Sequence, residues 1–288
     1  MLEALAGAGI GAAAMVGLYA SLAPRTSLCG PVFYGNGRAS RQLALTFDDG
    51  PNDPHTLRLL EILARENVRA TFFLIGMHVA QRPDIVREIL AAGHAIGNHT
   101  QTHPRLAFLS AARVEQELAG CQRVIEDAAG LRPTVFRPPY GLKRPDVVAT
   151  ARALGLATVT WSVLAYDWYG ITADSVERHI RRQVRGGDVI VLHDGSHRRI
   201  GADRTHSVEA ARRIVPHYKR QGFEFLTVPE MMETLSPPST PRTQRKDLAT
   251  DQHDMDCKSI WIRVSPRKSA AGIFSQRTRR ARLGGECF

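Results

Sequence analysis

The sequence of 288 residues predicts an α/β protein whose sheet is mainly parallel and covered by helices. Between residue 41 and about residue 230, short apolar runs alternate with longer segments of helical periodicity, the order typical of repeated β–α–β units. Some runs, such as Val189-Ile-Val-Leu192, are apolar throughout, as in strands buried on both faces. Periodicity does not separate an open doubly wound sheet from a closed barrel, so both architectures stay open at this point.

The elements of this domain, about residues 40–230, follow from the same pattern. The apolar runs place strands at residues 42–47, 70–75, 94–97, 134–137, 157–163, 188–193 and 224–227. Helical periodicity places helices at residues 55–66, 83–92, 110–129, 145–154, 173–185 and 207–221. The helix at 110–129 is the best delimited, because Ser110 is a favourable start and Gly130 a favourable stop.

The N-terminal segment, residues 1–24, is a separate element. Residues 4–23 carry no charge, and a helix of about 20 residues spans the roughly 30 Å of a bilayer core. The stretch also lacks the basic start of a secretory signal. A membrane anchor, a weak signal peptide and a helix packed on the domain are the three interpretations. We favour the anchor, and with it a location at the membrane or cell envelope; the orientation stays open.

The C-terminal segment, residues 236–288, is polar and basic and opens with Ser-Pro-Pro-Ser-Thr-Pro241. It holds 11 lysines and arginines against 5 acidic residues, which is +6 of the chain's net charge of +10. Such a composition predicts a disordered tail. A basic cluster alone is a weak motif, so we expect a solvated tail and no nucleic-acid partner.

The cysteines give little information about the compartment. Among Cys29, Cys121, Cys257 and Cys287, no pair has the spacing of a zinc finger or a redox motif. Cys121 shares the apolar face of a predicted helix, so we expect it in the core. A bridge between Cys29 and Cys121 is an option without support in the sequence.

Two adjacent carboxylates end the first predicted strand. Asp48 and Asp49 follow the run Leu43-Ala-Leu-Thr-Phe47, and Gly50-Pro51 then breaks it. If adjacent side chains at this strand end diverge, as they do in regular β structure, the two acids can take different tasks, one binding metal and the other meeting a water molecule.

A histidine pair, His99-Thr-Gln-Thr-His103, follows a later strand. Positions i and i+4 share one face of a helix, so both rings would reach one ion there; an irregular loop would serve as well. With Asp49 the pair would form a site of two histidines and one carboxylate with open positions for water. That donor set suits zinc and also accepts cobalt, nickel or iron.

Three further motifs follow in order: Arg137-Pro-Pro-Tyr140, Asp167-Trp168 and Leu192-His193-Asp194. His193 closes a buried-type strand, and in α/β folds the carboxyl ends of strands are where sites are built. The remaining histidines in this half, at positions 179, 197, 206 and 217, have no such setting, and we interpret them as surface residues.

With all five motifs in view, residues 40 to 230 resemble the polysaccharide deacetylases that share the NodB homology domain, carbohydrate esterase family 4. The resemblance implies a distorted (β/α) barrel, often with seven strands. It also implies a divalent metal, zinc before the other ions. One departure concerns the position after Trp161, where the family often carries an Asp and this chain has Ser162; it puts the shape of the substrate groove in doubt.

The resemblance implies roles residue by residue. Asp49, His99 and His103 would hold the metal. The catalytic group would comprise Asp48 as general base, His193 as general acid, Arg137 and Asp167 as the residues that orient and tune them, and the Tyr140 backbone N–H for the oxyanion. The substrate would contact Tyr140, Trp168, Leu192 and Pro139, with Trp168 and Leu192 lining the acetyl pocket.

The expected function is a metal-dependent hydrolase that removes N-acetyl groups from N-acetylglucosamine-type residues of a polysaccharide or oligosaccharide, such as peptidoglycan, a chitin-like oligomer or an envelope glycan. One alternative keeps the site and changes the substrate to a lipid-linked sugar or a small amide. A less favoured alternative is a silent carbohydrate-binding module, although such a module would be expected to have lost ligands or the base.

Overall fold

The computed structural model describes residues 15–37 and 40–235. Its eight strands are β1 (Gln42–Gly50), β2 (Thr71–Leu74), β3 (Ala95–Asn98), β4 (Val135–Phe136), β5 (Ala157–Thr158), β6 (Val163–Leu164), β7 (Asp188–His193) and β8 (Glu224–Phe225). Its α-helices from residue 40 on are α2 (His55–Arg65), α3 (Gly76–Gln81), α4 (Pro83–Ala91), α5 (Ala111–Ala129), α6 (Pro145–Ala153), α7 (Ala173–Gln183), α8 (Thr205–Arg220) and α9 (Val228–Glu233). Single 3₁₀ turns lie at Leu106–Phe108, Pro139–Gly141 and Asp167–Tyr169.

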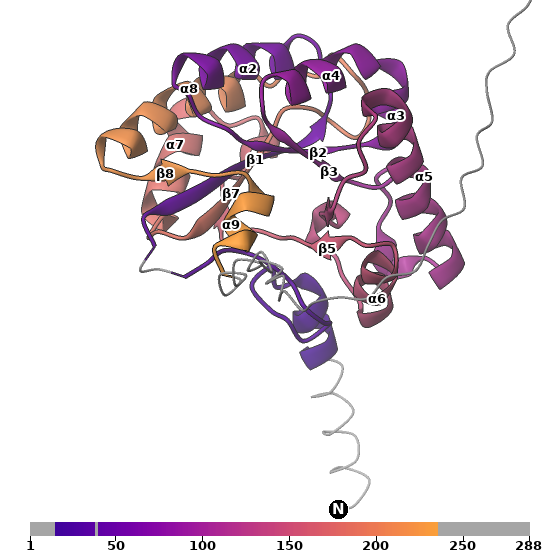
Figure 1. Ribbon diagram of the computed structural model, residues 1–288. Helices are drawn as coiled ribbons and strands as arrows, with labels where there is room; N and C mark the ends of the chain where they lie inside the picture. The colour runs from indigo at the N-terminus through magenta and orange to yellow at the C-terminus, as the bar shows by residue number, and fades with distance from the viewer. Residues whose placement is uncertain (1–14, 38–39, 236–288) are drawn as a thin grey trace, which may run out of the picture. The chain divides into compact units, whose positions relative to one another are not determined.

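The strands form one parallel sheet in the order β5-β4-β3-β2-β1-β7-β6, with β8 paired to the start of β1. The two edge strands, β5 and β6, are consecutive in the chain and joined only by residues 159–162. Because the five steps from residue 158 to residue 163 span at most about 18 Å, the sheet must curl until its edges approach each other. The expected distorted (β/α) barrel is therefore confirmed, and helices surround its outer face (Figure 1).

The seam between the two edges is covered by the segment that precedes β1. Phe33 forms a parallel bridge with Val159, and Gly35 forms an antiparallel bridge with Asp188. Upstream of these bridges, the Thr160 hydroxyl donates to Pro24 O over 2.6 Å and the Lys143 ammonium donates to Ala23 O over 2.6 Å. The folded unit thus begins before the expected boundary at residue 40.

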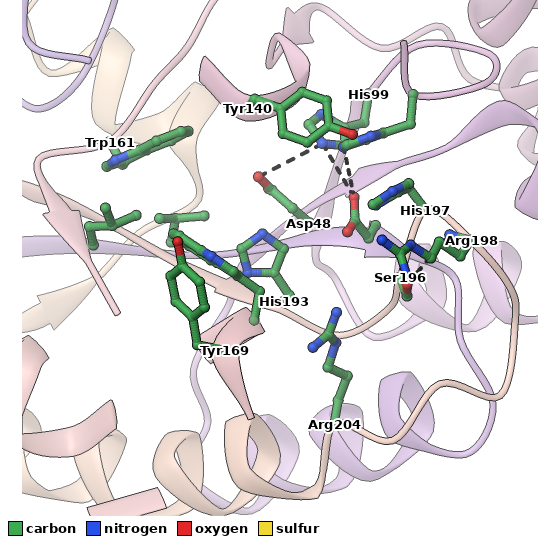
Figure 2. Close-up of a pocket in the computed structure, with 15 residues that line it drawn as sticks. Asp48, His99, Tyr140, Trp161, Tyr169, His193, Ser196, His197, Arg198 and Arg204 are labelled. Carbon is green, nitrogen blue, oxygen red and sulfur yellow. Dashed lines mark hydrogen bonds and ion pairs between the residues drawn. The ribbon is translucent and has the colours of Figure 1, made fainter. Parts of the chain in front are cut away.

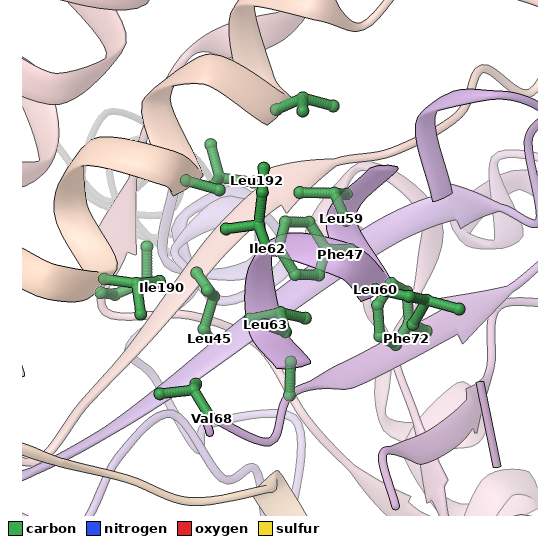
Figure 3. Close-up of a cluster of buried hydrophobic side chains, with 14 of the residues drawn as sticks. Leu45, Phe47, Leu59, Leu60, Ile62, Leu63, Val68, Phe72, Ile190 and Leu192 are labelled. Carbon is green, nitrogen blue, oxygen red and sulfur yellow. The ribbon is translucent and has the colours of Figure 1, made fainter. Parts of the chain in front are cut away.

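The larger hydrophobic core lies between the sheet and its helices (Figure 3). Alternate residues of β1, namely Leu43, Leu45 and Phe47, face this core, and the Phe47 and Phe72 rings stack with centroids 5.1 Å apart. A smaller cluster of buried apolar side chains on the other face of the sheet includes Phe73 and Met231 of α9. Together the two clusters fix the strands whose ends carry the polar motifs.

Most expected elements lie within two residues of their observed bounds. The expected strand 157–163 is wrong as one element, because the chain turns between β5 and β6. The sequence interpretation also missed α3 and α9, each of six residues. A capping box of Thr227 and Glu230 starts α9, and this Thr-x-x-Glu pattern is visible in the sequence.

Three expectations about the rest of the chain have different outcomes. Cys29 and Cys121 are both buried and unpaired, so the optional bridge is absent. The tail at 236–288 and most of the apolar segment, residues 1–14, lie outside the described residues. Residues 15–22 are helical, and within the described part of the chain no helix is long and apolar enough to cross a membrane.

Candidate active site

The polar motifs lie at the ends of four strands, at one end of the barrel. Asp48, His99, Arg137 and His193 lie at or directly after the carboxyl ends of β1, β3, β4 and β7, and parallel strands bring those ends to the same rim. A cavity of about 580 Å³ opens there (Figure 2). Its lining comprises Asp48, Asp49, His99, His103, Tyr140, Trp161, Leu164, Trp168, Tyr169, Val191, His193, Ser196, His197, Arg198 and Arg204.

Both adjacent carboxylates line this cavity, which regular strand geometry does not allow. The pairing of β1 with β2 shifts register between Asp48 and Gly50, and Asp49 has a left-handed backbone with φ of 74°. This irregularity turns the Asp49 side chain to the same side as Asp48. The expectation that the acids diverge as in an ordinary strand was wrong, because the strand ends in a bulge.

The histidine pair lies on an irregular loop, so the helical option is wrong and the loop option holds. Thr100 and His103 both have positive φ, at 69° and 60°. The loop is fixed by its own side chains, since Thr100 N donates to Asn98 Oδ1 over 2.8 Å and His103 N donates to Thr100 Oγ1 over 3.0 Å. Buried Glu117 of α5 accepts from both the N–H and the hydroxyl of Thr102.

Asp49, His99 and His103 present three ligand atoms to one point. Asp49 Oδ1 lies 3.5 Å from His99 Nε2 and 3.2 Å from His103 Nε2, and all three atoms lie within 4.8 Å of one another. Donors at 2.0–2.2 Å around a tetrahedral zinc ion would be about 3.4 Å apart. Asp49 Oδ1 is buried without a hydrogen-bond partner in the described chain, so this donor set fits a divalent metal.

The electrostatics of the triad favour a deprotonated carboxylate. Burial alone would raise the pKa of Asp49, but the neighbouring His103 and His99 imidazoles outweigh burial and hold that pKa well below its usual value. Burial also lowers the pKa of His103, which favours the neutral ring that a metal ligand requires. His99 Nδ1 lies 2.7 Å from Arg137 O, a contact that directs Nε2 toward the ion.

Arg137 is wholly buried and orients Asp48. Its Nη1 donates to Asp48 Oδ1 over 2.6 Å and to Thr46 Oγ1 over 2.7 Å, and its Nη2 donates to Thr160 O over 3.1 Å. The guanidinium also stacks on Phe73, with 4.1 Å from Cζ to the ring centroid. Arg137 does not reach the cavity; it leaves Asp48 Oδ2 to face the triad, 4.0 Å from His99 Nε2.

His193 is paired with buried Asp167 behind the cavity. The Nδ1 atom lies 2.8 Å from Asp167 Oδ1, while Asp167 Oδ2 accepts from His193 N and from the Ser207 hydroxyl, each over 2.7 Å. Burial lowers the pKa of His193, but the charge of Asp167 and its hydrogen bond prevail and raise it to about 9. His193 is therefore a cation at neutral pH, with Nε2 left for the cavity.

Tyr140 stands at the mouth of the cavity with φ of 59°. The hydrogen bonds of its turn are donated by Gly141 N to Pro138 O and by Leu142 N to Pro139 O, so the Tyr140 N–H takes no part in them. The Tyr140 ring packs edge-on against His103, with centroids 4.8 Å apart. Trp168, which also lines the cavity, packs edge-on against His193 with centroids 5.3 Å apart.

Two expected substrate contacts are contradicted. Leu192 is fully buried in the core between sheet and helices, while its neighbours Val191 and His193 line the cavity. Successive side chains of a strand alternate between faces, so Leu192 and His193 cannot share one. Pro139 is buried within its turn and does not line the cavity.

Among the residues at the site that the sequence interpretation missed, three contact the groups described above. His197 is half-buried and stacks on His103, with ring centroids 4.7 Å apart and planes at 13°. His206 Nε2 lies 2.5 Å from Asp167 O, and Ser207 supports the same carboxylate. His197 and His206 are thus not plain surface residues. Ser207 and His206 lie on one turn of α8, a signal that is visible only once α8 is known to pack against Asp167.

Comparison with known proteins agrees with this arrangement. The family model for polysaccharide deacetylases matches residues 35–159. A chitooligosaccharide deacetylase of a Bradyrhizobium species is 38% identical over 205 residues, which cover 69% of this chain and 94% of that protein. The chain belongs to the polysaccharide deacetylase family.

Solved structures of other polysaccharide deacetylase relatives share the fold. The peptidoglycan N-acetylglucosamine deacetylase Bc1960 is 34% identical, with a TM-score of 0.66 over 69% of this chain and 91% of that chain. A family 4 acetyl xylan esterase from Clostridium thermocellum, solved with a cobalt ion, is 33% identical, with a TM-score of 0.61 over 67% of this chain and 91% of its own. The cobalt ion in that esterase shows that a relative with this fold binds a metal, and Asp49, His99 and His103 are the residues that would hold a metal in this chain.

Proposed function

We propose that this chain removes N-acetyl groups from N-acetylglucosamine-type residues of a polysaccharide or oligosaccharide by metal-dependent hydrolysis. One observation carries the proposal. A metal-binding triad, a carboxylate oriented by a buried arginine, and a protonated histidine held by a buried aspartate all face a single cavity. These are the parts that amide hydrolysis requires. The chitooligosaccharide and peptidoglycan deacetylases among its relatives support the same chemistry.

We propose zinc as the metal. Two imidazoles and one carboxylate with open positions are a donor set that catalytic zinc uses, although cobalt, nickel and iron accept it too. When bound, the metal would polarise the acetamide carbonyl and lower the pKa of an attacking water. Asp49, His99 and His103 would hold it.

Asp48 is the proposed general base. Its Oδ1 is occupied by Arg137, so Oδ2 is the atom that receives the proton of the attacking water. The ion pair also fixes the direction of the carboxylate, so that no reorganisation is needed when the proton moves. The Tyr140 N–H would donate to the oxyanion of the tetrahedral intermediate.

His193 is the proposed general acid. Because Nδ1 is bound to Asp167, the proton on Nε2 is the one available to the departing amine. After donation the imidazole is neutral, and the C–N bond breaks to give acetate and the free amino sugar. Trp168 packs against this ring and restricts its rotation.

The decisive experiment measures acetate release from N-acetylglucosamine oligomers by the full chain, first stripped of metal and then supplied with zinc or cobalt. We expect release that requires metal and is lost in His103→Ala, which removes one ligand. Turnover by the stripped protein equal to that of the zinc form would contradict the proposal. Metal bound without acetate release would favour a lipid-linked sugar or a small amide as the substrate, whereas neither release nor bound metal would favour the silent carbohydrate-binding module.

A lipid-linked sugar is the second candidate substrate. In the helical residues 15–22, the side chains of Met15, Val16, Leu18, Tyr19 and Leu22 are all more than half exposed. Exposed apolar groups of this kind favour an interaction with a membrane or another apolar partner. Product assays on a lipid-linked N-acetylglucosamine and on the free oligomer would separate the two substrates.

The same observation supports our proposal that the protein acts at the membrane or cell envelope. Flotation of the full chain with anionic lipid vesicles, compared with a variant in which Val16 and Leu18 are replaced by Ser, is the test. Loss of flotation in the variant is the expected result. Equal flotation of both proteins would place the membrane contact elsewhere.

A further inference from the structure

The cavity has two unlike walls. Trp161 and Tyr169 form an aromatic wall on one side of the catalytic groups (Figure 2). Ser196, His197 and Arg198 lie on the opposite side of the cavity (Figure 2). The second wall is the loop 195–204 that follows β7. Arg204, at the end of this loop, directs its guanidinium into the cavity below His193 (Figure 2). We refer to His197, Arg198 and Arg204 as the basic rim.

The arginines of the basic rim have no carboxylate partner among residues 15–37 and 40–235. Neither Arg198 nor Arg204 lies within 4.0 Å of an acidic oxygen there, whereas Arg82, Arg144 and Arg212 each do. The two carboxylates that line the cavity already have other partners. Asp48 is paired with Arg137, and Asp49 faces the two histidines of the metal triad. The positive charge of the rim is therefore left uncompensated by the described chain.

The loop that carries the rim is held in place. Asn52 fastens it with three hydrogen bonds, donating to Asp194 O over 2.7 Å and to Ala202 O over 2.9 Å and accepting from Gly201 N over 2.6 Å. Such anchoring presents the rim in one geometry and lowers the entropy cost of binding.

Arg204 and His197 are fixed as well. Arg204 donates from Nε to Gly195 O over 2.6 Å, and within the described residues its two terminal nitrogens have no hydrogen-bond acceptor and can take a ligand. The His197 ring is stacked on His103. Two terminal guanidinium nitrogens form a planar fork that matches a carboxylate or a phosphate.

We propose that the basic rim binds an anionic group, a carboxylate or a phosphate, carried by the substrate beside the sugar whose acetamide is hydrolysed. This inference rests on the proposed function and narrows its substrate class. Arg204 would take the anion with its terminal nitrogens, and exposed Arg198 would add long-range attraction. A neutral chitin-type oligomer has no group for this subsite. A glycan with sugar-borne carboxylates, or a sugar phosphate, has one.

The test compares three tetrasaccharides of equal length under identical metal loading. One is neutral N-acetylglucosamine tetramer, the second alternates N-acetylglucosamine with a sugar bearing a lactyl carboxylate, and the third is the neutral tetramer with a terminal phosphate. We expect kcat/KM at low salt to be at least about tenfold higher for one anionic substrate than for the neutral one. The better of the two identifies the source of the charge.

Matched variants assign the preference to the rim. Arg198→Gln and Arg204→Gln should each reduce the anionic-to-neutral ratio of kcat/KM by about fivefold or more. Arg199→Gln is the control, because it removes the same charge from the next position, is exposed and does not line the cavity. Arg198 is also exposed, so its replacement leaves folding intact even if Arg204→Gln disturbs the loop.

Two results would overturn the inference: equal kcat/KM on all three oligomers, or an equal loss of preference in Arg198→Gln and Arg199→Gln. Calorimetric binding of the same oligomers to the full chain keeps the test independent of turnover. Tighter binding of an anionic oligomer without acetate release would refute the proposed function and retain the rim. Acetate release at the same kcat/KM from anionic and neutral oligomers would support the proposed function and refute the anion-binding rim.

Discussion

Asp167→Asn should shift the alkaline limit of activity to lower pH. In the native protein, Asp167 Oδ1 accepts from His193 Nδ1, and Oδ2 accepts from His193 N and from Ser207. An asparagine that keeps its oxygen in the Oδ2 position must turn its NH₂ toward Nδ1. That nitrogen then has to accept, so the doubly protonated ring is disfavoured. In the variant, burial still lowers the pKa of His193, and the negative charge of Asp167 no longer raises it.

The magnitude follows from the two pKa values. With the pKa of His193 at about 9, the ring is about 90% protonated at pH 8. At its ordinary value of 6.5 it is about 3% protonated at the same pH. The loss of the acid form alone therefore reduces turnover about 30-fold at pH 8. The direction of the shift follows from the pKa of His193. In the native protein the raised pKa keeps His193 protonated until the pH rises through about 9, and in the variant His193 loses its proton at lower pH.

The assay is a pH profile of kcat/KM for acetate release between pH 5.5 and 10, with metal content checked at each pH. The alkaline limb should lie near pH 9 in the native protein and more than two units lower in Asp167→Asn. Ser207→Ala is the matched control, because it removes one hydrogen bond from Asp167 and no charge; its limb should move far less. An alkaline limb that stays in place in Asp167→Asn would refute His193 as the general acid.

Three other substitutions test separate parts of the structure. Asp48→Asn should reduce kcat at least about 100-fold while the metal stays bound, as shown by metal analysis of the purified variant; near-native turnover would exclude this residue as the base. Leu192→Ala should lower the free energy of unfolding by about 2–5 kcal/mol in a urea titration, and lost activity at native stability would restore Leu192 to the cavity. Gly141→Ala places a Cβ 2.8 Å from Trp161 Cη2 at φ of 69°, so it should lower both stability and turnover. Gly130→Ala has a similar φ of 65° and open space around it, so it carries the backbone cost alone and should leave turnover intact.

The order of the longer strands and helices was predictable because it depends on apolar periodicity, which those elements display. Strand β7, for example, has the bounds that its apolar run indicates. The short helices α3 and α9 were not found, because six residues are too few to establish a period of 3.6. The location of the site was predictable for a topological reason, since parallel strands deliver their carboxyl ends to one rim.

The details of the site depend on backbone irregularities that carry no periodic signal. Asp49 and His103 both adopt positive φ, which a non-glycine residue rarely does. The residues next to them in the sequence do not predict this conformation. His197 lies in a loop without pattern, so its stacking on His103 was hidden. The error at Leu192 was different in kind. Strand alternation places it opposite His193, and the sequence alone contained that information.

The segment across the barrel seam has a consequence for strand pairing between copies of the chain. An uncovered edge strand is a template on which another chain can add a strand, the first step of aggregation. Phe33 bridges Val159 just after β5, and Phe33 N donates to Thr158 O over 2.9 Å, so this edge is already taken. Removal of residues 15–37 would therefore do more than shorten the chain. It would expose a strand edge at the seam, on which a second copy of the chain could add a strand.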